Sequence, residues 1–446
     1  MSDLDQWMKS RGIREVECLV PDMSGIARGK ILPANKFMAL NHEKGLRVPE
    51  SVFVQTVTGE YPEEDVTSES NIDVFIRPDG DTIRMVPWYS EPTAQVICDC
   101  YYADNRPVNI SPRHVLKKVI DLYAERGLQP IVAPELEFFL VKTNPDPDYA
   151  LEPPVGRSGR PENGRQSYGI DAVSEFDALF DDVYNFCHAQ EIDIDTLSHE
   201  AGAAQMEINF NHGHPLLLAD TVFIFKRTVR QAAIRNGVYA TFMAKPMQNE
   251  PGSAMHIHQS LLDVKTGLNP FSTSEGEDTE LFRHYIGGLR KYLPQTMLLF
   301  GPNVNSYRRL VANFDAPINT HWGQDNRTVG LRVPISSPKA RRIENRLPGA
   351  DANPYLAIAG SLACGLLGMS EKIDPGKAIE GSGYTRAHSL PRHFPEALDK
   401  FASSKPLKDI LGEDFVEAYT AVKKAEWDAY QRVVSSWERE YLLLSV

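Results

Sequence analysis

The stretch PIVAPELEFFL, Pro130–Leu140, decides the fold of the larger part of this chain, and it reads as an apolar strand. Side chains two apart on a strand point to the same face, so Glu135 and Glu137 share a face with Ile131, whereas the opposite face is wholly apolar. A half-exposed strand would keep apolar residues off its polar face. We therefore predict that both glutamates are buried, where a carboxylate needs a cation or a donor, and a metal site is the simplest partner.

Two more strand-like stretches repeat the spacing, His256-Ile257-His258 after a glycine turn and Glu344-Asn345-Arg346. A lone histidine is more often a satisfied core residue than a ligand, and two on one face leave the question open. The stretch HEAGAAQMEIN, residues 199–209, adds Glu200 and Glu207 around small residues that let backbone approach a ligand. Alone, acidic residues at this separation usually decorate a surface.

After the His256–His258 stretch, arginines accumulate along the chain. Arginine is suited to bidentate recognition of phosphate and carboxylate. Interleaved with carboxylates in an acidic chain, the arginines predict a polyanionic ligand bridged by divalent metal, as phosphoryl transfer requires. The chain has no phosphate-binding loop of the Gly-x-x-x-x-Gly-Lys type, no kinase motif set and no dinucleotide fingerprint. The arginines are Arg308, Arg309, Arg327, Arg332, Arg341, Arg342 and Arg346.

Composition narrows the class of protein. The chain has 446 residues, 42% of them hydrophobic, and a formal net charge of −13, which argues against nucleic acid as a main partner and is compatible with cationic substrates. No apolar run approaches the roughly 20 residues that span a bilayer. The acidic start, residues 1–6, lacks the features of a signal peptide, so we expect a cytoplasmic protein without membrane contact. The five cysteines are widely spread, and we expect reduced thiols in the core.

The coarse pattern is α+β. Residues 13–105 look strand-rich, with strands at Glu15–Val20 and Thr82–Val86. A boundary follows, where Ser111 is a suitable N-cap and Pro112 a suitable first residue of a helix. We predict a small N-terminal domain over residues 1–108 and a large catalytic domain over residues 109–446.

Further elements are expected in the second domain. Residues 142–167 are rich in Pro, Gly, Asn and Arg and predict a surface loop. Helices are expected at Ala172–Gln190, Phe415–Tyr430 and Val433–Tyr441.

Taken together, these motifs resemble the glutamine synthetase superfamily, bacterial type I, along nearly the whole chain. The most specific match is ATFMAKP at residues 240–246 followed by GSAMHIH at residues 252–258. The pairs Glu135-x-Glu137 and Glu344-x-Arg346 recur in the family's order, as do Glu200 to Glu207 and Asn326-Arg327. Residues 28–30 and 78–88 match the family's N-terminal β-grasp domain. The resemblance implies such a domain joined to a catalytic domain with an antiparallel sheet and flanking helices.

The resemblance also implies a set of site residues. Two clusters would hold divalent metal, Mg²⁺ or Mn²⁺: Glu137, Glu200 and Glu207 near the amino acid, and Glu135, His256 and Glu344 between the ATP phosphates. ATP would lie along His258, Ser260, Arg327, Arg332 and Lys339. Glutamate would be held by Gly252, Arg309 and Arg346. Asp315, Arg327 and Arg309 are the expected catalytic residues.

The implied reaction has two steps. ATP phosphorylates the γ-carboxylate of glutamate, and an amine then attacks the γ-glutamyl phosphate and releases phosphate. Members of the family work as dodecamers of two hexameric rings, in which the N-terminal domain of one subunit closes the site of the next. A non-catalytic relative would be expected to lose metal ligands, and all six are present here.

Departures from the family pattern concern the amine. The region of residues 48–53 lacks the motif Asp-Gly-Ser-Ser, whose aspartate helps to bind ammonium, and the flap NFDAP, residues 313–317, carries Asp315 where the family has a glutamate. An Asn-Gly pair has become Pro251-Gly252. These changes open the ammonium cage and predict a larger primary amine, whose proton Asp315 can still accept.

The chain is most similar to the γ-glutamylpolyamine (glutamate–putrescine) ligase branch, including the ending WEREYL at residues 437–442. We therefore expect putrescine, cadaverine, spermidine or spermine as the amine, in polyamine catabolism. Two alternatives stay open: a glutamine synthetase that uses ammonia, and a ligase for a monoamine such as ethanolamine.

Overall fold

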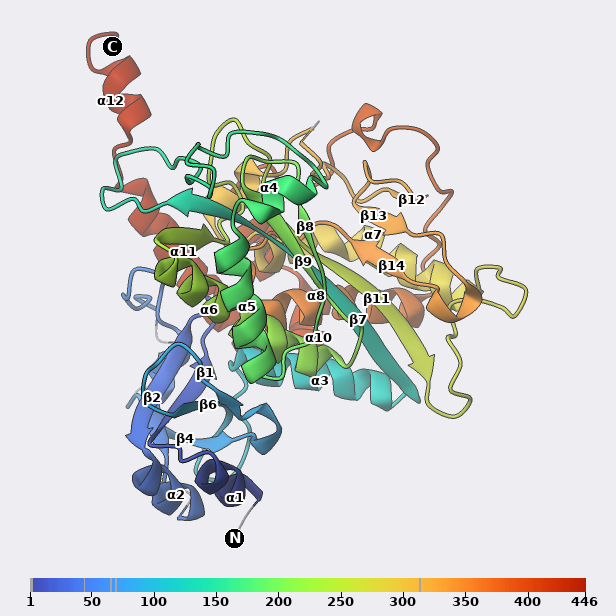
Figure 1. The fold of residues 1–446 in the computed structure, drawn as a ribbon. Helices are drawn as coiled ribbons and strands as arrows, with labels where there is room; N and C mark the ends of the chain where they lie inside the picture. Colours follow the sequence, from blue (N-terminus) through green and yellow to red (C-terminus); the bar gives the residue numbers. More distant parts are fainter. Residues whose placement is uncertain (1–2, 44, 65, 69, 313) are drawn as a thin grey trace.

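Two β-sheets organise the fold (Figure 1). The computed structural model describes residues 3–43, 45–64, 66–68, 70–312 and 314–446. The first sheet has six strands in the order β2-β1-β6-β4-β3, with β5 paired to β6. All its pairs are antiparallel except β1 with β6. Its strands are β1 (Glu15–Pro21), β2 (Ala27–Pro33), β3 (Arg47–Pro49), β4 (Asp73–Pro78), β5 (Arg84–Met85) and β6 (Thr93–Tyr101).

The second sheet has eight strands in the order β12-β13-β14-β11-β7-β9-β8, with β10 paired to β7. Its pairs are antiparallel apart from β12 with β13. The longest strand, β7 (Leu128–Lys142), lies centrally and contains the stretch Pro130–Leu140 with its two glutamates. The other strands are β8 (Ile194–His199), β9 (Gln205–Phe210), β10 (Val238–Thr241), β11 (Met255–Asp263), β12 (Trp322–Gln324), β13 (Leu331–Val333) and β14 (Ile343–Asn345).

Helices cover the apolar face of this sheet. On β7 the alternation predicts one wholly apolar face, and Val132, Leu136, Phe138 and Leu140 are indeed buried there. Helices α3 and α6 pack against β7, and α8, buried on nearly all sides, packs on α7, α3 and α6. The helices are α3 (Pro112–Ala124), α4 (Ile170–Ser174), α5 (Asp177–Ala189), α6 (Pro215–Arg235), α7 (Glu280–Phe300), α8 (Pro354–Glu371), α9 (Phe394–Ala402), α10 (Lys405–Leu411), α11 (Glu413–Gln431) and α12 (Ser436–Leu442).

A buried arginine joins the first sheet to the helices that cover the second. Arg113, in the first turn of α3, donates to Asp99 of β6 at 2.6 Å, to Asp79 after β4 at 2.6 Å and to Asp220 of α6 at 2.8 Å. The Tyr355 hydroxyl of α8 donates to the same Asp220 at 2.6 Å. The arginine is 1% exposed, so these contacts satisfy a charge that burial would otherwise penalise. The small helices α1 (Asp3–Ser10) and α2 (Ala34–His42) complete the N-terminal part.

Two sequence predictions fail locally. The strand expected at Thr82–Val86 shrinks to β5, because Gly80–Thr82 form a 3₁₀ turn in which the Asp79 side chain accepts from the Asp81 amide. The helix expected at Ala172–Gln190 is divided into α4 and α5. At the break, the Glu175 carbonyl accepts from the Arg157 amide and its carboxylate from the Ser158 amide, so a neighbouring loop takes the bonds that a continuous helix would use.

The remaining elements follow the predictions more closely. Helix α3 begins at Pro112, and residues 142–167 carry no helix. Helix α11 covers the expected segment, whereas α12 begins at Ser436, where Ser435 and Glu438 form a capping box. All five cysteines are free and buried. In the described part of the chain, no helix is long and apolar enough to cross a membrane.

Candidate active site

Strand register gathers the acidic and imidazole side chains on one face of the second sheet. Residues directly opposite in an antiparallel pair point to the same side. Residues that share a face within each strand therefore also share that face across β9, β7, β11 and β14. The opposed pairs are Glu137–Glu207, Glu135–His256 and His258–Glu344.

Glu135 lies between the two histidines. Its Oε1 is 2.8 Å from Nε2 of His258, and its Oε2 is 3.6 Å from Nδ1 of His256. Burial alone would raise the pKa of Glu135, but the hydrogen bonds to His256 and His258 outweigh it and lower the pKa. Burial and the neighbouring Arg346 charge lower the pKa of His256 to about 4, so this imidazole is neutral at pH 7 and has a free lone pair for a metal.

Three carboxylates at this site form no ion pair with a lysine or arginine that the structure describes, although the charges of Arg309 and Arg346 act on Glu137 and Glu200. Burial, followed by the charges of Glu200 and Glu207, raises the pKa of Glu137 well above its ordinary value. Burial also raises the pKa of Glu200, and burial with the charges of Glu200 and Glu135 raises that of Glu207 to about 8. The described residues provide no lysine or arginine partner for these three groups. Such a site favours either protons or a divalent cation.

The donor atoms fit a divalent metal. In two groups, one ligand atom from each residue lies within 4.8 Å of the others: Glu135 with Glu207 and His256, and Glu135 with His258 and Glu344. Carboxylate oxygens with imidazole nitrogen are suitable donors for Mg²⁺ or Mn²⁺. These groups differ from the two expected clusters in that Glu135 belongs to both, whereas Glu137 and Glu200 belong to neither.

Arginines enclose the other end of the cluster. Glu344 is fully buried and accepts from Arg346 at 2.5 Å and from Arg332 at 2.8 Å. Burial raises the pKa of Glu344, but the charges of Arg346 and then His258 and His256 reverse this and lower it to about 2. Arg332 also donates to Asp325 at 2.6 Å. The carboxylate of Glu344 is therefore ionised and fixed.

Arg309 is buried beside Gly252. Its guanidinium donates to the carbonyls of Leu347 at 2.8 Å and Arg346 at 2.9 Å. A Cβ at Gly252 would lie 2.5 Å from the Arg309 side chain and 2.5 Å from the Ala244 carbonyl. Only glycine allows this close approach. Gly252 therefore positions Arg309, and the family resemblance implies that both residues bind glutamate.

The flap lies over this region. Asp315 is exposed, with φ of 53° in the left-handed region, and its carbonyl accepts from Arg346 at 3.4 Å. The Lys245 ammonium stands 4.4 Å from the centre of the Phe314 ring. Asn313, also part of the predicted flap, lies outside the described residues.

Other predicted site residues lie further from the cluster. The Ser260 hydroxyl, on β11, donates to the Arg341 carbonyl at 2.8 Å. Arg327 and Lys339 are exposed, and their side chains form no hydrogen bond or ion pair with any residue that the structure describes.

Several residues at the site were missed from sequence. Gln205 donates to Glu137 at 3.2 Å and to the Gly252 carbonyl at 3.0 Å, and its position two before Glu207 on β9 could have revealed it. Arg342, which the sequence indicated only as one of the accumulated arginines, donates to Nδ1 of His258 at 3.1 Å. Nε2 of His199 faces Oε1 of Glu162 at 4.0 Å, and Glu162, in the polar loop, gave no sequence signal.

Comparisons with known proteins identify the family of this chain. Residues 109–442 match the family described as glutamine synthetase, catalytic domain. The chain belongs to the glutamine synthetase family. Among its relatives, γ-glutamylputrescine synthetase PuuA of Escherichia coli K12 is 34% identical, over 96% of this chain and 91% of that protein. Glutamate–isopropylamine ligase of a Pseudomonas species is 32% identical over 94% and 92%, and glutamine synthetase of Pyrococcus abyssi is 33% identical over 94% and 92%.

The fold of the glutamine synthetase family extends over the whole molecule. A solved structure of GmaS without ligand covers 100% of this chain and 100% of its own, with a TM-score of 0.85 and 27% sequence identity. A GmaS complex with ADP covers 99% of this chain with a TM-score of 0.84. The α+β class and the family resemblance predicted from sequence are thereby confirmed.

Proposed function

We propose that this protein is an ATP-dependent ligase that joins the γ-carboxylate of glutamate to a primary amine of putrescine, cadaverine, spermidine or spermine. Its coarse class, glutamate–amine ligase, follows from the family and from relatives named for such reactions. The observation that carries the proposal is the set of carboxylates and histidines on one sheet face, bordered by buried arginines. Because the reaction consumes ATP and glutamate, we place it in the cytoplasm. Because the proposed amine is a polyamine, we place it in polyamine catabolism.

We assign two divalent cations to the acidic face. Glu137, Glu200 and Glu207 would hold one, and Glu135, His256 and Glu344 the other. The raised pKa values of Glu137, Glu200 and Glu207 support the first, because the arginine charges nearby do not offset the burial and mutual repulsion of these carboxylates. Mg²⁺ or Mn²⁺ bound there would neutralise phosphate charge and polarise the carboxylate that is phosphorylated.

We assign the substrates to the residues around that face. Glutamate would bind at Gly252, Arg309 and Arg346, where two buried guanidiniums lie together. ATP would extend along His258, Ser260, Arg332, Arg327 and Lys339. The exposed, unpaired side chains of Arg327 and Lys339 support this assignment, since they are free to contact phosphate.

The reaction follows from these positions. In the first step an oxygen of the γ-carboxylate attacks the γ-phosphorus of ATP and ADP leaves, while Arg332 and Arg327 stabilise the charge on the moving phosphoryl group. In the second step the amine nitrogen attacks the acyl carbon, Asp315 accepts its proton, and phosphate leaves with the original carboxylate oxygen. Arg309 holds the glutamate in line for both steps.

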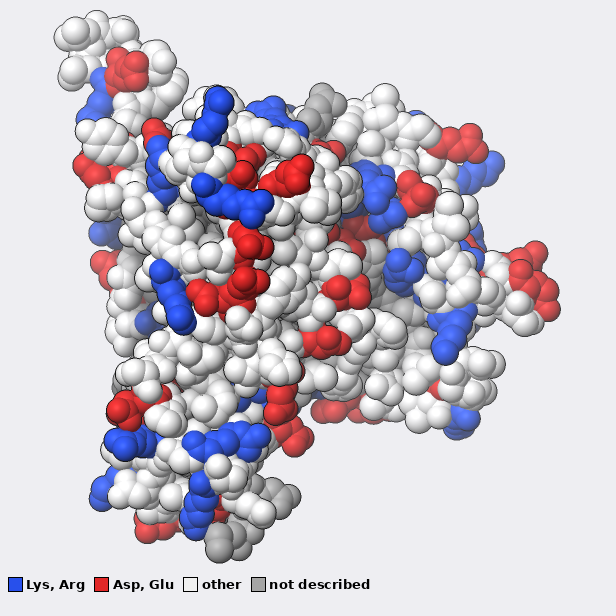
Figure 2. Space-filling model, viewed as in Figure 1, with Lys and Arg blue, Asp and Glu red and all other residues white. Residues whose placement is uncertain are grey.

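The choice of a polyamine rests on the amine side of the site. Asp315 is shorter than the glutamate expected in the family's flap, and the ammonium motif is absent near residue 50. The surface is acidic, with a net charge of −13, and Figure 2 shows acidic side chains gathered over the region of α5, which would attract a cationic substrate. Relatives that act on putrescine, on isopropylamine and on ammonia have similar identities, so ammonia and a monoamine remain competing candidates.

We further propose the domain division 1–108 and 109–446 and a dodecamer of two hexameric rings. The first sheet ends at Tyr101 and the family match begins at residue 109, which supports the division. The C-terminal segment 433–446 supports self-association, because Trp437, Leu443 and Leu444 are exposed on it.

An isotope experiment tests the proposed chemistry. Glutamate with ¹⁸O in both γ-carboxylate oxygens is incubated with the enzyme, Mg²⁺, ATP and putrescine, and the phosphate formed is analysed by mass spectrometry. We expect one ¹⁸O in each phosphate released. Unlabelled phosphate together with γ-glutamylputrescine would contradict a γ-glutamyl phosphate intermediate, and absence of any amide product would contradict ligase activity.

A further inference from the structure

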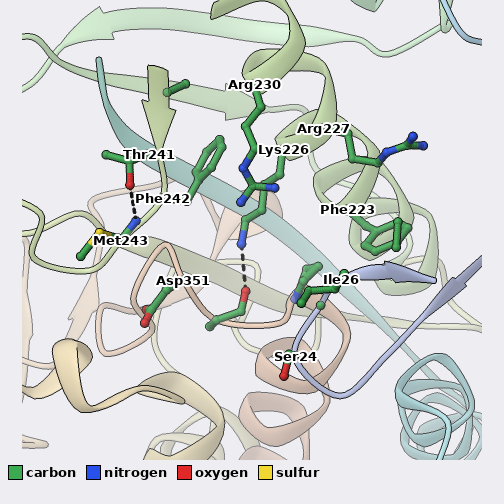
Figure 3. Close-up of a pocket in the computed structure, with 15 residues that line it drawn as sticks. Ser24, Ile26, Phe223, Lys226, Arg227, Arg230, Thr241, Phe242, Met243 and Asp351 are labelled. Atoms are coloured by element: carbon green, nitrogen blue, oxygen red, sulfur yellow. Dashed lines mark hydrogen bonds between the residues drawn. The ribbon is translucent and has the colours of Figure 1, made fainter. Parts of the chain in front are cut away.

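A cavity of about 330 Å³ lies away from the acidic face. It opens between the turn that joins β1 to β2, helix α6, the end of β10 and the segment that leads into α8 (Figure 3). None of the residues that we assign to metal, ATP, glutamate or the amine lines it. Its volume is sufficient for a small organic molecule and larger than an inorganic ion requires.

Two cations from one helix lie at this cavity without a carboxylate between them. Lys226 and Arg230 are one turn apart on α6, and Figure 3 shows both extending toward the same space. The Lys226 ammonium donates to the carbonyls of Ala350 at 2.6 Å and Ala352 at 2.9 Å. Arg230 stacks over the Phe242 ring at 5.1 Å and has no ion-pair partner among the described residues. Burial and then the Arg230 charge lower the pKa of Lys226 to about 7, an effect that a bound anion would reverse.

Two other charged groups, Arg227 and Asp351, line the cavity. Arg227 turns its guanidinium away, to Glu17 at 2.8 Å and Gln95 at 2.6 Å. Oδ2 of Asp351 accepts from Ser306 at 2.6 Å and from Asn303 at 2.8 Å, whereas its buried Oδ1 has no hydrogen-bond partner among the described residues, and its charge acts to raise the pKa of Lys226. With Arg227 paired to Glu17, the cavity is lined by two further cations, Lys226 and Arg230, and one carboxylate, Asp351, so its charge is net positive.

The remaining walls are mostly apolar. Phe223, Phe242, Ile26 and Pro354 line the cavity beside the two cations. A ligand that uses the whole space combines an anionic head with a carbon skeleton. Arginine and lysine together recognise carboxylate and phosphate heads equally well.

We propose that this cavity is a binding site for a small organic anion, a carboxylate or a phosphate ester. Its head contacts Arg230 and Lys226, and its carbon skeleton lies against Phe223 and Phe242. The site is separate from catalysis and is built by both parts of the chain, because the turn Ser24–Ala27 forms one wall and α6 another.

The structure also connects this site to the glutamate position, a consequence that rests on the proposed function. Lys226 holds the segment Ala350–Ala352, and the Ala350 amide donates to the Ser253 carbonyl at 3.0 Å, next to Gly252. A few residues earlier, the same segment supplies the Leu347 carbonyl to Arg309. An anion that draws the Lys226 ammonium toward itself loosens these bonds, so we expect it to change KM for glutamate more than kcat.

Calorimetry on the full-length assembly tests binding independently of turnover. The active site is first saturated with Mg²⁺, ADP and glutamate, and the probes are inorganic phosphate, glycerol 3-phosphate, glutarate and hexanoate. We expect at least one carbon-containing probe to bind more tightly than inorganic phosphate, and the preferred head group distinguishes a phosphate ester from a carboxylate. Arg230→Gln should weaken that probe about tenfold or more, the loss of a charge-assisted hydrogen bond.

Arg235→Gln, on the same helix but 60% exposed and paired with Asp182, is the matched control and should bind as the wild type does. The proposal is overturned if no probe binds, or if Arg230→Gln binds the preferred probe as well as Arg235→Gln does. The coupling is tested by KM for glutamate with and without the preferred probe. A probe that binds without changing KM contradicts the coupling and leaves the binding site standing.

Discussion

At the scale of single residues, the proposed metal binding depends on the protonation of Glu207. Its pKa, about 8, is higher than in an unfolded chain. Such a group stabilises the metal-free fold at low pH, and the stabilisation is lost as the pH rises from about 4 toward 8. A bound cation needs the ionised carboxylate, so binding at neutral pH releases protons.

We therefore predict that Mg²⁺ raises Tm more at about pH 8.5 than at about pH 6.5. Thermal unfolding with and without the metal measures this, and calorimetry in two buffers of different ionisation enthalpy counts the protons released at neutral pH. Glu207→Gln should bind Mg²⁺ more weakly and release fewer protons. Equal Tm shifts at both pH values would show that the cluster is already ionised without metal.

A second residue-scale prediction concerns the proton acceptor. Asp315 is exposed on the flap and held near Arg346 through its backbone, so its carboxylate is available to an incoming amine. Asp315→Asn should lower kcat by about 100-fold, the range for losing a general base. Phosphorylation of glutamate should persist, detected as hydroxamate when hydroxylamine, an amine of low pKa, replaces the polyamine.

Asp315→Glu is the matched change at that position. It extends the carboxylate by one methylene and should improve use of ammonia relative to putrescine. If Asp315→Asn retains normal turnover of putrescine, another group accepts the proton.

At the scale of elements, the Arg113 network couples the N-terminal sheet to α3, α6 and α8. Replacing Arg113 with methionine leaves Asp79, Asp99 and Asp220 without their shared cation. We predict a loss of about 3 kcal/mol in the free energy of unfolding, as found when one partner of a buried pair is removed. Urea unfolding of the metal-free protein checks this.

Arg126→Met, an exposed arginine just after α3, is the control and should change stability by less than about 0.5 kcal/mol. Equal unfolding midpoints for the two variants would mean that the free-energy cost of burying Arg113 equals the stabilisation from its three ion pairs.

The strands and helices also show which features of the fold and site could be predicted from the sequence. The two-residue period correctly placed Glu135 and Glu137 on one face of their strand and His256 and His258 on one face of theirs, because strand geometry alone fixes each pair. Pairing between strands is non-local, so the sequence could not show that Glu135 lies in both groups of metal-binding atoms. The break between α4 and α5 depends on hydrogen bonds from the loop amides of Arg157 and Ser158 to Glu175. Hydrophobic periodicity within the helix carries no information about these bonds.

At the scale of the whole molecule, the C-terminal segment predicts association between subunits. Helix α12 projects from the body at the upper left of Figure 1, and Leu443 and Leu444 are 74% and 94% exposed beyond it. Deleting residues 433–446 should reduce the mass of the assembly in sedimentation, because apolar surface of this kind is rarely left uncovered. Glu440→Gln, a polar change on the same helix, should leave the mass unchanged. An unaltered mass after the deletion would assign assembly to other surfaces.

The amine that the intact enzyme prefers tests the proposed function. Phosphate release is measured with Mg²⁺, ATP and glutamate at matched concentrations of ammonia, ethylamine, ethanolamine, putrescine, cadaverine, spermidine and spermine. We predict that kcat/KM for a diamine or polyamine exceeds that for ammonia by more than about tenfold, or ~1.4 kcal/mol in transition-state stabilisation. A preference for ammonia would contradict the account and identify a glutamine synthetase with a shortened flap carboxylate, and a preference for ethylamine or ethanolamine would identify a monoamine ligase.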